Sequence, residues 1–135
     1  MRKEHGPKVS KKTNDIEFEI AFYESILKGT PDFIEALSVI GDLYTKAGMW
    51  QKGLDVDLRL VKLRPEDPMI YYNLACSYAL LNQNQPSLAS LTKAIELGYD
   101  DFEYLKTDGD LENLFKDPDV QHYIRQLEKS KKPVE

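Results

Sequence analysis

The fold is decided by two consecutive stretches of equal length, "IEALSVIGDLYTKAGMWQKGLDVDLRLVKLRPED" at residues 34–67 and "PMIYYNLACSYALLNQNQPSLASLTKAIELGYDD" at residues 68–101. Shifting the chain against itself by 34 residues superimposes them. The positions that coincide are Leu37 with Tyr71, Ile40 with Leu74, Gly41 with Ala75, Tyr44 with Tyr78, Gly53 with Ser87 and Leu63 with Leu97. A period of this length indicates tandem units, each of which is one supersecondary motif.

Both copies place their apolar residues at helical spacing, and neither strand alternation nor Asn-Gly hairpin turns occur. A capping residue followed by proline predicts helix starts at Thr30-Pro31, Asp67-Pro68 and Asp117-Pro118. Glycine predicts helix ends at Gly29, Gly48 and Gly98. The predicted helices lie near residues 15–28, 31–47, 50–63, 68–82, 86–97 and 118–129. The turns between them are short enough to make neighbours antiparallel.

This pattern resembles the tetratricopeptide repeat (TPR), in which a large residue precedes Leu-Gly and Tyr, and a small residue and a closing Pro follow. Gly41 and Gly53 stand where the two helices of one unit cross closely, as Ala75 and Ser87 do in the second copy. The resemblance implies an all-α fold, a short α-α solenoid. In that fold, antiparallel helix pairs form a right-handed superhelix that ends in a helical C-terminal cap.

The resemblance also implies the domain organisation. We expect a single domain over residues 14–129, between a disordered basic tail (1–13) and a disordered end (130–135). Within it lie a partial repeat (14–30), two repeats (34–67 and 68–101) and capping helices (102–129). The last segment resembles the one that ends many bacterial TPR arrays. The residues expected to cover the last repeat are Phe102, Leu105, Leu111, Leu114, Phe115, Val120, Tyr123, Ile124 and Leu127.

The distribution of charge and the cysteine content limit the range of possible functions. The net charge of −5 combines +4 on residues 1–13 with −9 on the remainder, so the folded part lacks the basic face that nucleic acids require. Nucleic-acid binding through the basic tail stays an alternative. A single cysteine cannot form an internal disulfide, and neither a signal peptide nor a membrane span is evident, so we expect a cytoplasmic protein without membrane partners.

Few residues suggest chemistry. Cys76 has only Asn73 and Ser77 beside it and no nearby histidine, so we interpret it as a small filler of the core rather than a nucleophile. Asp108 and Asp110 lack the later ligands of a calcium loop, and Asp108 fits better as a helix cap. The sequence therefore predicts no enzyme activity, no metal and no cofactor.

TPR proteins generally dock a peptide or helix of another protein in their concave groove, so the resemblance implies an interaction scaffold. Its predicted partner-binding residues are Glu35, Ser38, Asp42, Met69, Tyr72, Asn73, Cys76 and Leu80. Because Glu35 and Asp42 are acidic, we expect a basic partner. The amide of Asn73 can both donate to and accept from a peptide backbone.

The first predicted helix suggests an alternative function, homo-oligomerisation. Ile16, Ile20, Tyr23 and Leu27 form one apolar face, which the next repeat can cover. Phe18, Phe22 and Ile26 form a second face, whose usual cover is the missing first helix of the unit. We expect this face to be a dimer contact, and the alternative is that the preceding tail folds back over it.

Overall fold

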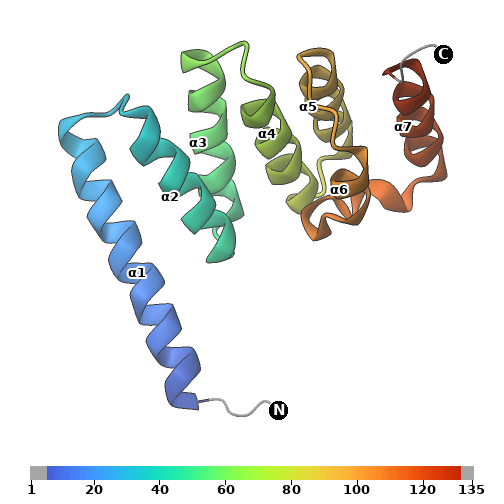
Figure 1. Ribbon diagram of the computed structural model, residues 1–135. Coiled ribbons are helices and arrows are strands. Elements are labelled where there is room, and N and C mark those ends of the chain that lie inside the picture. Colours follow the sequence, from blue (N-terminus) through green and yellow to red (C-terminus); the bar gives the residue numbers. More distant parts are fainter. Residues whose placement is uncertain (1–5, 132–135) are drawn as a thin grey trace. The chain divides into compact units, whose positions relative to one another are not determined.

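The computed structural model describes the backbone of residues 6–131 and the side chains of residues 15–131. Every regular element in this part of the chain is a helix, which confirms the predicted all-α class. The chain forms two compact units, which divide between Leu63 and Arg64 (Figure 1). None of the described helices has the length and apolar character needed to cross a membrane.

The first unit contains α1 (Gly6–Gly29), α2 (Ile34–Lys46) and α3 (Trp50–Leu63), with α2 in contact with both others (Figure 1). Its buried core consists of Ile20, Ile40, Leu43 and Tyr44, and the half-buried residues packed on it are Ile16, Tyr23, Leu27 and Val56. The predicted inner face of α1 is therefore confirmed. A hydrogen bond of 2.5 Å from the Tyr44 hydroxyl to Glu24 also ties α1 to α2.

Two glycines allow α2 and α3 to cross closely, as the repeat pattern predicts. A Cβ atom on Gly41 would lie 3.2 Å from Cγ1 of Val56. One on Gly53 would lie 3.0 Å from Oγ1 of Thr45, closer than nearly all real Cβ contacts. Larger residues at either position would push the helices apart.

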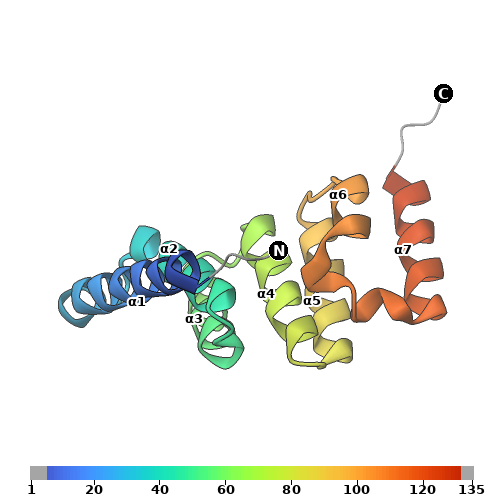
Figure 2. The ribbon, with the colours of Figure 1, turned by 90° about the horizontal axis from the view of Figure 1, so that it is seen from below.

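The second unit begins with α4 (Pro68–Leu80) and α5 (Asn84–Glu96), which lie side by side in Figures 1 and 2. The Asp67 side chain accepts a hydrogen bond from the Met69 backbone, which confirms the predicted cap of α4. Ser87 is fully buried and donates a hydrogen bond of 2.7 Å to the carbonyl of Ala75. The small residues therefore serve the close crossing in this repeat as well.

The turns inside the two repeats are equivalent. Gly48 ends α2 with φ of 77°, and Asn82, one period later, has φ of 61°. The residue after each turn donates to the carbonyl of the repeat tyrosine, with distances of 2.8 Å from Met49 to Tyr44 and 2.9 Å from Gln83 to Tyr78. Asparagine is among the few residues other than glycine that adopt this left-handed conformation readily.

The chain continues from α5 into α6 (Phe102–Thr107), two 3₁₀ turns, η1 (Gly109–Leu111) and η2 (Leu114–Lys116), and α7 (Pro118–Lys131). Leu105, Leu111 and Leu114 are fully buried, and Ile124 is 1% exposed. Of the predicted covering residues, Phe102 and Val120 are also buried, and Phe115 and Leu127 pack on the core while half-buried. Tyr123 is 39% exposed and is the exception.

Two predicted helix starts are wrong. Pro31 lies in a turn, closed by a hydrogen bond of 3.2 Å from the Phe33 backbone to the Thr30 carbonyl, so α2 starts only at Ile34. Proline favours the second position of such a turn as strongly as the first turn of a helix, and the sequence alone does not distinguish them. The first helix starts at Gly6 instead of near residue 15, so residues 6–13 of the expected tail are helical. Residues 130 and 131 of the expected C-terminal end are also helical, because α7 continues to Lys131. The remainder of the predicted tails, 1–5 and 132–135, lies outside the described residues.

Candidate partner-binding surfaces

The structure contradicts part of the groove predicted on α4. Tyr72 is 3% exposed and Cys76 is 7% exposed, so neither side chain is available to a partner. The physical reason is that the chain covers them itself, since η1 packs directly against α4. The Tyr72 ring also stacks on Tyr99 with centroids 4.6 Å apart and planes at 18°. Cys76 is buried, as predicted for a filler of the core.

Asp108 closes this part of the surface. Its carboxylate accepts a hydrogen bond of 2.6 Å from the Tyr72 hydroxyl and a contact of 3.8 Å from Sγ of Cys76. It also accepts from the backbone of Asp110 at 3.0 Å, which confirms its predicted role as a cap. The sequence analysis found the cap and missed the bond to Tyr72, because only the course of the chain after α6 brings the two side chains together.

Burial governs the ionisation of these tyrosines. Desolvation raises the pKa of Tyr72, and its hydrogen bond to Asp108 raises it further, because an anion beside a carboxylate is disfavoured. Desolvation also raises the pKa of Tyr99 to about 12. Both side chains are therefore neutral at physiological pH, and nothing in this cluster resembles an activated nucleophile.

Few side chains of α4 remain exposed to solvent. Met69 is 49% exposed, Asn73 is exposed and Leu80 is half-buried. Tyr72 and Cys76 are buried, so Met69 and Asn73 are the predicted contact residues of α4 whose side chains are exposed to a ligand.

The corresponding row on α2 is open in the first unit. Glu35, Ser38 and Asp42 are all exposed, as predicted, and Val39 beside them is 39% exposed. Lys46 pairs with Asp42 at 3.0 Å, but both side chains are 64% exposed, so water screens the pair. This row offers two carboxylates, a hydroxyl and an apolar side chain along one helix face.

The outer face of α1 is open as well. Phe18 is 72% exposed and Phe22 is 52% exposed, while Ile26 is half-buried. Phe22 contacts the ring of Tyr23 edge to face with centroids 5.2 Å apart, which leaves its outer surface uncovered. Among the described residues, Phe18 is the most exposed large apolar side chain.

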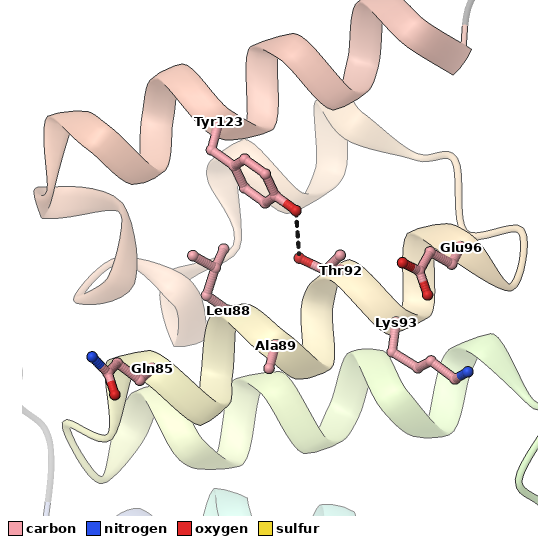
Figure 3. Close-up of a pocket in the computed structure, with 7 residues that line it drawn as sticks. All are labelled: Gln85, Leu88, Ala89, Thr92, Lys93, Glu96 and Tyr123. Carbon is pink, nitrogen blue, oxygen red and sulfur yellow. Dashed lines mark hydrogen bonds between the residues drawn. The ribbon is translucent and has the colours of Figure 1, made fainter.

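A further hollow lies between α5 and α7, and the sequence analysis missed it. It measures about 500 Å³ and is lined by Gln85, Leu88, Ala89, Thr92, Lys93, Glu96 and Tyr123 (Figure 3). Figure 3 shows Tyr123 reaching from α7 toward Thr92 on α5, with an oxygen–oxygen distance of 3.4 Å. Within residues 15–131, no group of three His, Cys, Asp or Glu side chains is arranged to hold a metal ion.

Comparison with solved structures identifies the architecture. The structure named "MamA 41-end from Desulfovibrio magneticus RS-1" aligns with a TM-score of 0.66 and 20% identity, over 91% of this chain and 72% of that one. The "MamA RS-1 ArsTM double mutant" aligns with a TM-score of 0.63 and 19% identity, over 92% and 72%. The chain has a helical-repeat fold of the TPR type.

Comparison of sequences adds one relative. The chain is 33% identical over 90 residues to a chloroplastic protein from Arabidopsis thaliana, in an alignment that covers 64% of this chain and 27% of the plant protein. The chain thus spans about a quarter of that relative's length. No protein-family model matches the sequence.

Proposed function

We propose that the chain is a non-enzymatic interaction module that holds a basic peptide or helix of another protein on the exposed row of α2. The observation that carries the proposal is the contrast between two equivalent helices. On α4 the chain covers its own row with Asp108 and η1, whereas on α2 the row of Glu35, Ser38 and Asp42 is exposed. A TPR-type fold supplies the rigid helices on which such a row is presented.

The two carboxylates of the α2 row favour a basic partner. Glu35 and Asp42 lie two turns apart on one face of α2, at a spacing that two cationic side chains of a peptide can match. The pair between Asp42 and Lys46 is worth little because it is exposed, so a lysine or arginine from a partner can replace Lys46. A surface this small supports binding in roughly the micromolar range. Asn73 and Met69 on α4 are proposed separately, as partner contacts of the second unit by itself.

A peptide titration tests this function. Short Lys- and Arg-rich peptides carrying a fluorescent label should bind with a Kd that rises with salt, and Asp- and Glu-rich counterparts should bind more weakly. Asp42→Lys should weaken binding of the basic peptides by about tenfold, since it reverses a charge in the row. Asp55→Lys is the matched control, because Asp55 is an exposed acid on α3, outside the row, and its carboxylate accepts a hydrogen bond from Gln51 on the same helix.

The comparison has clear outcomes. Equal losses in Asp42→Lys and Asp55→Lys would mean that net charge alone drives binding and that α2 is not the site. Preference for the acidic peptides would refute a basic partner.

A second candidate function is self-association through α1, with Phe18, Phe22 and Ile26 as the contact. Its supporting observation is the exposure of two phenylalanines on a helix whose other face is held in the core. Leaving each ring in water forgoes about 1.5–3 kcal/mol of burial free energy.

A further inference from the structure

The outer face of α1 has a shape that complements itself. The large residues Phe18, Phe22 and Ile26 follow one another at every fourth position and form a ridge. Next to this ridge lies a second row of Ala21, Ser25 and Gly29, all exposed and all small. A ridge of large side chains beside a furrow of small ones is what two helices need in order to interlock.

We infer that two copies of this chain pair through α1 in antiparallel orientation, with Phe22 at the two-fold axis. The inference rests on the second candidate function above and specifies its geometry. In this register Phe18 lies opposite Ile26 of the second copy, and each phenylalanine ridge enters the furrow beside the other copy's ridge. A second copy fits because it carries the complement of this face on the same helix.

Charge fixes the orientation. At about 100° per residue, Glu17 and Lys28 differ by only about 20° around α1, so they flank the ridge and its furrow on the same side. In an antiparallel pair related by a two-fold axis, each flank faces the same flank of the other copy. Lys28 then faces Glu17 of the second copy, and the contact occurs twice. In a parallel pair each flank of α1 faces the other flank of the second copy, so Lys28 and Glu17 do not meet.

The other flank of the ridge is also compatible with this register. Asp15 and Glu19 are acidic and exposed, and like charges facing one another would oppose pairing. About Phe22 as the centre, the residues of that flank that lie at the matching heights in the second copy are Ile26 and Thr30, which carry no charge. The helix is anchored for such a contact, since Ile20 is buried against α2 and Glu24 accepts from Tyr44 at 2.5 Å.

The first test measures the dimer and its apolar contact. Sedimentation velocity of the full chain should show a reversible dimer whose population rises with concentration in the micromolar range, since one helix pair is a small interface. Phe18→Glu with Phe22→Glu should make it monomeric with unchanged helix content. Phe33→Glu, at a site that is 41% exposed but lies in the turn after α1, is the matched control and should leave the dimer intact.

The second test reads the orientation by disulfide trapping in a Cys76→Ala background. Phe22→Cys should cross-link to itself. A mixture of Phe18→Cys and Ile26→Cys proteins should cross-link to each other, while Phe18→Cys alone should not, because its two copies lie about 12 Å apart along the helix. Self-linking of Phe18→Cys as efficient as that of Phe22→Cys would overturn the antiparallel register.

Charge exchange provides an independent reading. Glu17→Lys and Lys28→Glu should each weaken the dimer by about two- to tenfold, and the doubly exchanged protein should recover most of the affinity. Additive loss in the double variant would overturn the proposed pairing. A wild type that stays monomeric at hundreds of micromolar would overturn self-association altogether, while the peptide titration on α2 would still decide the first proposed function separately.

Discussion

Removal of the Asp108 carboxylate should destabilise the second unit through the loss of two identifiable hydrogen bonds. In the folded chain the carboxylate accepts from the Tyr72 hydroxyl at 2.6 Å, and Tyr72 is 3% exposed, so Asp108→Ala leaves a buried donor without its acceptor. An unsatisfied buried hydroxyl costs about 1–3 kcal/mol. Loss of the cap on the Asp110 backbone adds about 1 kcal/mol. We expect a total loss of about 2–4 kcal/mol.

Tyr72→Phe should cost less, about 1–2 kcal/mol, because the ring keeps its stacking on Tyr99 and no buried donor is left unsatisfied. In the double variant the penalty for the orphaned hydroxyl disappears. The two changes together should therefore cost about 1–2 kcal/mol less than the sum of the single losses.

Urea unfolding followed by far-UV circular dichroism measures these free energies. Trp50 is the sole tryptophan and lies at the start of α3, so its fluorescence follows the first unit and serves as an internal reference. Tyr123→Phe is the matched control, because Tyr123 is exposed and its contact with Thr92 is long at 3.4 Å; it should cost under about 0.5 kcal/mol. Strictly additive losses of Tyr72→Phe and Asp108→Ala would refute the reasoning.

Three further outcomes follow from the backbone and the tyrosines. Asn82→Ala should lower the free energy of unfolding by about 1–2 kcal/mol, because alanine tolerates φ of 61° poorly, and recovery in Asn82→Gly would show that the backbone is responsible. Gly53→Leu should lower the free energy of unfolding by at least about 1–3 kcal/mol, because the leucine side chain clashes with Thr45. Gly109→Ala should be near neutral in the same thermal-unfolding experiment, since nothing lies within 4 Å of an added Cβ. Burial raises the pKa of Tyr99 from near 10 to about 12, so the free energy of unfolding that this shift contributes is present below pH 10 and should be lost as the pH rises toward 12. Circular dichroism and tyrosinate absorbance should then change together. Ionisation of all tyrosines before unfolding would contradict this.

The repeat was predictable from the sequence because its constraints are local and occur twice. Gly41 and Gly53 are required by a crossing too tight for side chains, and the same requirement makes Ser87 fully buried on Ala75. The apolar residues of the last segment, such as Leu105 and Leu111, are buried because an end repeat needs a cover.

The covered row on α4 was not predictable in the same way. Alignment of the repeats transfers an exposed row from one copy to the next. It therefore predicts an exposed Tyr72, whereas only its counterpart on α2, Ser38, is exposed. Whether such a row stays open depends on where the chain goes after the repeat. That course is set by long-range contacts, such as the one between Tyr72 and Asp108, which span 36 residues and leave no periodic signal.

The bond between Tyr72 and Asp108 also limits how this protein can grow by gene duplication. A copy of the α2–α3 pair inserted after α5 would separate Asp108 from Tyr72 by one further period, and the last pair would then carry Ser38 where Tyr72 stands now. A serine side chain is shorter than that of tyrosine, so the new last pair would need a tyrosine at that position to reach Asp108. A copy inserted before α4 would leave the bond intact. Lengthening of this array is therefore compatible with its chemistry at one boundary and opposed by it at the other.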